Sequence, residues 1–95
     1  MNAEILEVVD HWTVICRLDL PLAVSIVRPV RLTGVTVLKK TETIEFLREL
    51  IGCSVSVFIR EDKTKKYGQL LGRIVHKGSD ISSLLIDSKY AKKFK

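Results

Sequence analysis

The chain has 95 residues, of which 46% are hydrophobic and 28% charged, and a net charge of +5 at pH 7. This length suffices for one domain but not for two separate cores, so we expect a single domain over residues 1–95. The chain contains no apolar run of eighteen residues and no signal-peptide pattern, which predicts a cytoplasmic protein with no membrane partner. Its positive charge favours an anionic partner such as nucleic acid, a nucleotide or an acidic protein.

The first part of the sequence predicts three β-strands. Residues 4–9, 13–20 and 23–37 are rich in Val, Ile, Leu and Thr, and turn residues separate them. Pro29 marks an edge or a bulge within the third run, because proline cannot donate to a strand ladder. Three consecutive strands with short connections favour an antiparallel meander. Cys16 falls in the inward register of the second strand, and we expect both Cys16 and Cys53 to be small buried hydrophobes.

Residues 39–52 predict a helix. The apolar residues that share one helical face are Ile44, Leu47, Leu50 and Ile51. Thr41 or Thr43 is the expected N-cap, and Gly52 supplies the end.

The last part predicts a β-hairpin followed by a short helix. Residues 53–60 and 69–78 alternate as strands around a basic turn, and Gly72 indicates a bulge or a bend at a barrel corner. Residues 79–91 form the helix, with Ser79 or Asp80 as cap, and the basic tail 89–95 is expected to be frayed. Three strands, a helix, two strands and a helix predict an all-β to α+β fold, a five-stranded OB-type Greek-key barrel.

Three segments of the chain resemble the staphylococcal-nuclease-like family. Asp10-His11-Trp12-Thr13 matches the D-G-D-T turn of that family, and residues 31–39 (RLTGVTVLK) match its R-L-x-G-[IV]-D-x-P-E motif. Residues 65–69 (KKYGQ) match its D-K-Y-G-R motif, and residues 18–32 are similar to the form found in phage and bacterial members. The resemblance covers most of the chain and implies an OB barrel that hydrolyses phosphodiesters with calcium.

The residues at the family's catalytic positions argue against that activity here. The resemblance places Trp12 and Thr36 at the two metal-binding aspartates, Lys39 at the glutamate near the water, and Gln69 at the second arginine. Only Arg31 matches. Calcium requires several oxygen ligands and a water nucleophile requires a base, so we expect no calcium site, no cofactor and no nuclease activity.

The same positions predict a basic pocket for a phosphorylated ligand, in which arginine can grip phosphate and aromatic rings can stack on bases. The residues that the resemblance assigns to this pocket are Trp12, Arg31, Thr36, Lys39, Lys65, Lys66, Tyr67 and Gln69. The favoured function is therefore an inactive nuclease-like domain that binds a nucleotide or single-stranded nucleic acid.

Other interpretations stay open at this point. Trp12 either stacks on a ligand, fills the space of the former metal site, or contacts another subunit. A protein-interaction module, with Ile15 and Trp12 at the interface, is the second hypothesis; it includes a phage protein that acts on a host factor or sequesters a nucleotide signal. A residual metal-dependent nuclease that uses Arg31 and Glu42 is the third.

Overall fold

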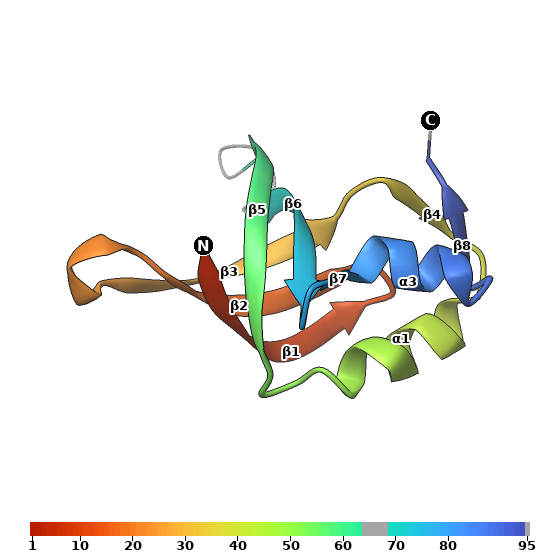
Figure 1. The fold of residues 1–95 in the computed structure, drawn as a ribbon, viewed down its shortest axis with the longest axis horizontal. Coiled ribbons are helices and arrows are strands. Elements are labelled where there is room, and N and C mark those ends of the chain that lie inside the picture. Colours follow the sequence, from red (N-terminus) through yellow and green to blue (C-terminus); the bar gives the residue numbers. More distant parts are fainter. Residues whose placement is uncertain (64–68, 95) are drawn as a thin grey trace.

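The structure is a computed structural model that describes the backbone of residues 1–63 and 69–94 and the side chains of residues 1–60 and 70–94. Its strands are β1 (Asn2–Asp10), β2 (Thr13–Asp19), β3 (Ser25–Leu32), β4 (Val35–Val37), β5 (Ser54–Lys63), β6 (Gln69–His76), β7 (Ser79–Asp80) and β8 (Ala91–Lys93). Its helices are the short η1 (Pro21–Ala23), α1 (Lys40–Arg48) and α3 (Ile81–Asp87). Figure 1 shows their arrangement.

Five strands form a closed barrel. Strands β3, β2, β1, β5 and β6 pair antiparallel in this order. The barrel closes where β3 runs parallel to β6, with Val30 opposite Leu70 and Leu32 opposite Gly72. Helix α1 connects β4 to β5, and α3 follows β6 and β7 (Figure 1). This closed barrel with two short helices confirms the OB-like α+β fold that the sequence predicts.

The barrel interior is filled by every second residue of the strands. On β2, Val14, Cys16 and Leu18 are buried, as the alternation predicts. Burial raises the pKa of the Cys16 thiol to about 11, because the interior disfavours the thiolate. Cys53 is only half-buried, so the expectation of a buried residue holds fully for Cys16 alone. Both cysteines are free.

Helix α1 begins at Lys40 with Lys39 as its N-cap, not at Thr41 or Thr43 as the sequence predicts. The reason is tertiary: the amides of Leu38 and Lys39 both donate to the carbonyl of Tyr90, at 2.8 and 3.0 Å, and fix the chain just before the helix. Of the predicted apolar face, Leu47 and Leu50 are buried and Ile44 is half-buried, whereas Ile51 is exposed.

The end of the chain differs from the frayed tail that the sequence predicts. Strand β8 pairs antiparallel with β4, and Ala91 is buried in this two-stranded ribbon. Accordingly, the single strand predicted over residues 23–37 is two strands, which Thr33 and Gly34 separate. Gly34 has a φ of +83°, a conformation that glycine adopts readily, and it redirects the chain toward β8.

The end of α3 places β8. Asp80 is the N-cap of this helix and accepts from the Ser83 amide. At the other end, the amide of Lys89 donates to Ile86 and the amide of Tyr90 to Leu85, each at 3.0 Å, which is the Schellman arrangement. Lys89 takes the left-handed position with a φ of 64°, where glycine is usual. The helix therefore stops at Asp87 and the chain turns into β8.

The hairpin of β2 and β3 extends beyond the barrel (Figure 1). Leu22 at its tip is 94% exposed, and Val24 and Val27 are about half exposed. Leu22 and Ala23 both have positive φ, at 65° and 60°. Pro29 lies on the open edge of β3, since the pairing with β6 begins only at Val30. The predicted edge position of Pro29 is thus confirmed.

Gly72 lies at an irregularity in the β5–β6 pairing, as the sequence predicts. Its partner is Ile59, and the register of β5 shifts between Ile59 and Glu61. A Cβ atom on Gly72 would lie 2.7 Å from the carbonyl oxygen of Phe58, so only glycine fits this close approach.

No helix among the described residues has both the length and the apolar character needed to cross a membrane.

Candidate functional site

A cavity of about 700 Å³ lies where the β1–β2 turn, β3 and β4 approach β5, β6 and the end of β8. The described residues that line it are Trp12, Arg31, Leu32, Thr33, Gly34, Val35, Thr36, Arg60, Leu71 and Phe94. The cavity thus combines apolar and aromatic surface with two arginines.

Two hydrogen bonds hold the turn that carries Trp12. Its amide donates to the Asp10 carboxylate at 3.0 Å, a local bond that is typical of aspartate in turns. Its carbonyl accepts from the Leu32 amide at 2.8 Å, which attaches the turn to β3. The indole is half-buried at the edge of the cavity, and the His11 ring centroid lies 4.6 Å from its own.

Arg31 lies over the face of Trp12. The distance from its guanidinium carbon to the ring centroid is 3.9 Å, well within the range of a cation–π interaction. Strand pairing holds Arg31 between Thr13 on β2 and Leu71 on β6. A guanidinium that stacks through its face keeps its N–H edge for a planar acceptor such as phosphate or carboxylate. Among the described residues, Arg31 forms no ion pair.

The wall at Thr33 and Gly34 is fixed by long-range hydrogen bonds. Thr33 donates to the carbonyl of Gly72 through its amide at 3.1 Å and its hydroxyl at 3.3 Å. The hydroxyl of Ser82, on α3, donates to the carbonyl of Thr33 at 2.9 Å. The amide of Phe94 donates to the carbonyl of Gly34 at 3.1 Å. The barrel, α3 and the end of the chain therefore together hold this wall in place.

The charge of the cavity is positive as far as its described lining extends. Arg31 and Arg60 are its two cations, and no carboxylate belongs to the described lining. Nor do the described residues contain a group of three His, Cys, Asp or Glu side chains that is close enough to hold a metal ion. The arrangement suits the binding of an anion with an apolar or aromatic part. The loss of the calcium site stays a prediction.

The structure brings together three of the eight residues that the sequence assigns to the pocket. Trp12, Arg31 and Thr36 line the same cavity. Lys39 is exposed at the start of α1 and does not belong to the described lining. The other four assigned residues fall outside the described side chains: Lys65, Lys66, Tyr67 and Gln69. Of these, only Gln69 has a described backbone, which pairs with Lys63 at the start of β6.

Sequence reasoning did not assign seven of the ten described lining residues to the site: four lie between Arg31 and Thr36, and three come from other segments. Arg60 and Leu71 come from the paired strands β5 and β6. The outward register of Arg60 in its strand was an available signal. Phe94 had no such signal, because its position depends on the pairing of β8 with β4, and a lysine-rich end predicts no strand.

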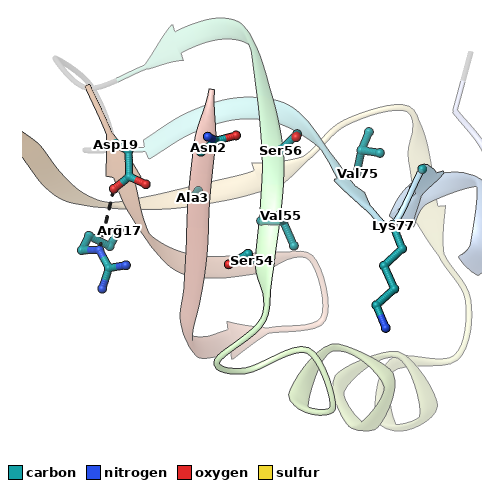
Figure 2. Close-up of a pocket in the computed structure, with 10 residues that line it drawn as sticks. Asn2, Ala3, Arg17, Asp19, Ser54, Val55, Ser56, Val75 and Lys77 are labelled. Carbon is teal, nitrogen blue, oxygen red and sulfur yellow. Dashed lines mark ion pairs between the residues drawn. The ribbon is translucent and has the colours of Figure 1, made fainter. Parts of the chain in front are cut away.

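A second cavity, of about 500 Å³, lies across β1 and β5 and is shown in Figure 2. Arg17 lies at one side of it and bonds to Glu4 at 2.8 Å, with Asp19 at 3.9 Å, so acids already neutralise this cation. Lys77 lies at the other side. The described residues that line this cavity include none that the sequence predicts for ligand binding, and we place the candidate site at Trp12 and Arg31.

Comparison of the chain with protein-family models and with curated proteins found no match. The resemblance to the staphylococcal-nuclease-like family therefore stays a prediction that rests on the three sequence segments.

Proposed function

We propose that this protein binds a phosphorylated ligand, a nucleotide or single-stranded nucleic acid, in the Trp12–Arg31 cavity and does not cleave it. The observation that carries the proposal is the stacking of Arg31 on Trp12, at 3.9 Å, in a cavity whose other described cation is Arg60. A stacked guanidinium is oriented before the ligand arrives, which reduces the entropy lost on binding.

The surroundings of this pair suit the two parts of a nucleotide. The N–H edge of Arg31 can bind a phosphate through two parallel hydrogen bonds. Leu71 and Phe94 provide apolar and aromatic surface for a base, and stacking on an aromatic ring contributes about 1–3 kcal/mol per base in single-strand binders. Thr36 adds a hydroxyl that donates or accepts.

The proposal excludes cleavage on chemical grounds. Hydrolysis of a phosphodiester requires a group that takes the proton of the attacking water, and carboxylates commonly serve in this role. The described lining contains arginines and no carboxylate. We therefore propose a binding protein and not an enzyme. A cytoplasmic location belongs to the same proposal, and the two free cysteines support it because reducing compartments keep thiols unpaired.

The experiment uses Trp12, the only tryptophan, as the reporter. Its fluorescence is titrated with thymidine monophosphate and with oligothymidylate at about 50 mM and about 200 mM salt. We expect a saturable change that weakens at the higher salt and is lost in Arg31→Ala. Arg31→Lys should restore binding only in part, since lysine lacks the planar fork.

The control is Arg28→Ala, which removes the same charge from an exposed position of β3 opposite Cys16 that is not in the described lining of the cavity. The projecting end of the β2–β3 hairpin lies away from β4 and β8 (Figure 1). Binding that is unchanged in Arg31→Ala, or equally reduced in Arg28→Ala, would overturn the proposed site. Cleavage of a labelled oligonucleotide on addition of calcium would overturn the proposal of a non-cleaving protein.

A second candidate function is the protein-interaction module. The projecting hairpin favours it, because Leu22, Val24 and Val27 expose apolar side chains well outside the barrel. We test it by analytical ultracentrifugation of the wild type and of Leu22→Asp. Self-association that Leu22→Asp abolishes would support this function, and a monomer at all concentrations would leave the hairpin without a role in self-association.

A further inference from the structure

We infer that the ligand is a single-stranded polynucleotide, which continues from the Trp12–Arg31 cavity along a row of lysines on β8 and at the start of α1. This inference rests on the proposed function and extends it from a nucleotide site to a longer binding surface. We call four lysines the lysine track: Lys39, Lys40, Lys89 and Lys92. Lys93 is not included, because side chains alternate along a strand and it projects from the opposite face of β8.

The pairing of β8 with β4 connects the track to the cavity. Lys92 lies directly opposite Thr36 in the antiparallel ribbon, and residues in opposite positions project from the same face. Phe94 follows the last residue of β8, and its amide donates to the carbonyl of Gly34. It lies two positions beyond Lys92 and is on that face as well, because side chains alternate along an extended chain. Thr36 and Phe94 both line the cavity. Lys92 therefore extends the face of β8 that borders the cavity.

The start of α1 continues this surface. The carbonyl of Tyr90 accepts from the amides of Leu38 and Lys39, which brings Lys39 and Lys40 to the end of β8 that is remote from the cavity. From the cavity outward, the exposed residues are Phe94, Lys92 and then the two lysines, while Tyr90 is half-buried and packs against the core. Residues two apart in a strand are separated by about 7 Å. A positively charged surface that follows the backbone, with an aromatic side chain for stacking, is what single-strand binders use.

The charge of the track favours a polyanion over a single nucleotide. All four lysines of the track are exposed, and residues 38–40 and 88–94 contain no acid. The nearest acids along the chain, Glu42 in the first turn of α1 and Asp87 at the end of α3, are also exposed to solvent. A mononucleotide in the cavity would leave the track empty, whereas a longer strand would neutralise it. Lysines act as point charges, so we expect binding along the track without base preference.

The experiment compares ligands of different length. Binding of thymidine monophosphate and of labelled oligothymidylate of about eight nucleotides is measured with the wild type and with the double variant Lys40→Ala/Lys92→Ala. We expect the wild type to bind the longer ligand at least about tenfold more tightly, and the double variant to lose most of this gain but to keep its affinity for the monophosphate. The salt dependence of oligomer binding should fall by about 1.4 in logarithmic slope, since each single-strand phosphate contact contributes about 0.7.

The control is Arg28→Ala/Lys77→Ala, which removes two charges outside the track and should keep the length dependence. An oligouridylate of the same length tests RNA against DNA, and the track predicts that both bind. Equal affinity for the monophosphate and the oligomer, or equal effects of the two double variants, would overturn the inference and leave the proposed function standing. If neither ligand binds the wild type, the proposed function fails as well.

Discussion

The guanidinium carbon of Arg31 lies 3.9 Å from the centroid of the Trp12 ring. This stack joins the β1–β2 turn to β3 and uses one partner from each, so the geometry of the turn decides the position of the arginine. The indole orients the arginine, and a base that stacks on Trp12 would have to share the ring with it.

Replacing Trp12 tests whether the stack prepares Arg31 for a phosphate. We expect Trp12→Ala to weaken binding of thymidine monophosphate by about two- to fivefold, which corresponds to a cation–π interaction of about 0.5–1 kcal/mol. Trp12→Phe should lie between this variant and the wild type, because it keeps an aromatic face. Isothermal titration calorimetry serves as the readout, since the tryptophan reporter is gone. An Ala variant that binds as tightly as the wild type would show that the stack has no orienting role.

Asp80 joins the cap of α3 to β6. Its carboxylate accepts from the Ser83 amide at 3.2 Å and from Arg73 at 2.8 Å. Asp80→Ala should lower the free energy of unfolding, with about 1 kcal/mol from the lost cap alone. Asp80→Asn should recover the part due to the cap, because asparagine caps as well, but not the part due to charge. Urea denaturation of the three proteins measures both parts, and an Ala variant as stable as the wild type would contradict this role.

The same carboxylate predicts a dependence of stability on pH. Burial of Asp80 raises its pKa, but the hydrogen bonds from Arg73 and Ser83, together with the charge of Arg73, outweigh burial and hold the pKa below its ordinary value of 3.8. A carboxyl group whose pKa is lower in the folded state stabilises above its unfolded pKa and loses this effect as the pH falls. The advantage of the wild type over Asp80→Asn should thus be complete at pH 7 and shrink below about pH 4. A constant difference down to pH 2 would contradict it.

Gly72 tests the close approach of β5 and β6. Because a Cβ atom would lie 2.7 Å from the carbonyl oxygen of Phe58, we expect Gly72→Ala to cost about 1–3 kcal/mol through displacement of the backbone. Gly52→Ala is the comparison: its Cβ meets no atom within 4 Å, and its cost comes only from a φ of +86°. Thermal unfolding of both variants measures the two losses of stability. If the Gly72 variant is as stable as the wild type, the strands can move apart without cost.

Lys89 occupies a position that favours glycine. Its φ of 64° is a left-handed conformation that costs a residue with a Cβ atom about 1–2 kcal/mol. Glycine avoids this cost, but its more flexible unfolded chain offsets part of the gain. We expect Lys89→Gly to raise the free energy of unfolding by about 0.5–1 kcal/mol. Lys89→Ala removes the same charge but keeps the strained backbone, so it should bring no such gain. Equal stability of the two variants would contradict the strain.

The two cysteines should differ in reactivity. Since burial raises the pKa of Cys16 to about 11, its thiol is protonated and inaccessible at pH 8, and it should react with Ellman's reagent only on unfolding. Cys53 is half-buried and should react first. The reaction of the folded protein should therefore persist in Cys16→Ser, and its loss in that variant would contradict the assignment. Burial raises the pKa of Cys16 from 9.0 to about 11 in the folded state. Its contribution to the free energy of unfolding is therefore lost as the pH rises from about 9 toward 11.

Local sequence was sufficient to predict most of the barrel. The strands alternate apolar and polar residues, and the helix repeats its apolar residues every three to four positions, because one face of each element must be buried. The positions of Gly72 and Pro29 were also predicted correctly, because glycine allows a close approach of two strands and proline cannot donate to a strand ladder. In the site, Trp12, Arg31 and Thr36 were selected through resemblance to a family, and the structure brings these three together.

Local sequence predicted neither β8 nor the full lining of the cavity. A segment of three residues rich in lysine becomes a strand only because β4 offers an unpaired edge and Ala91 can be buried beside it. That pairing brings Phe94 to the cavity, and the closure of β3 on β6 brings Leu71 beside Arg31. The sequence by itself determined which segments bury a face. Tertiary structure alone decided which distant segments meet, because pairing depends on the edges that remain open once the barrel has closed.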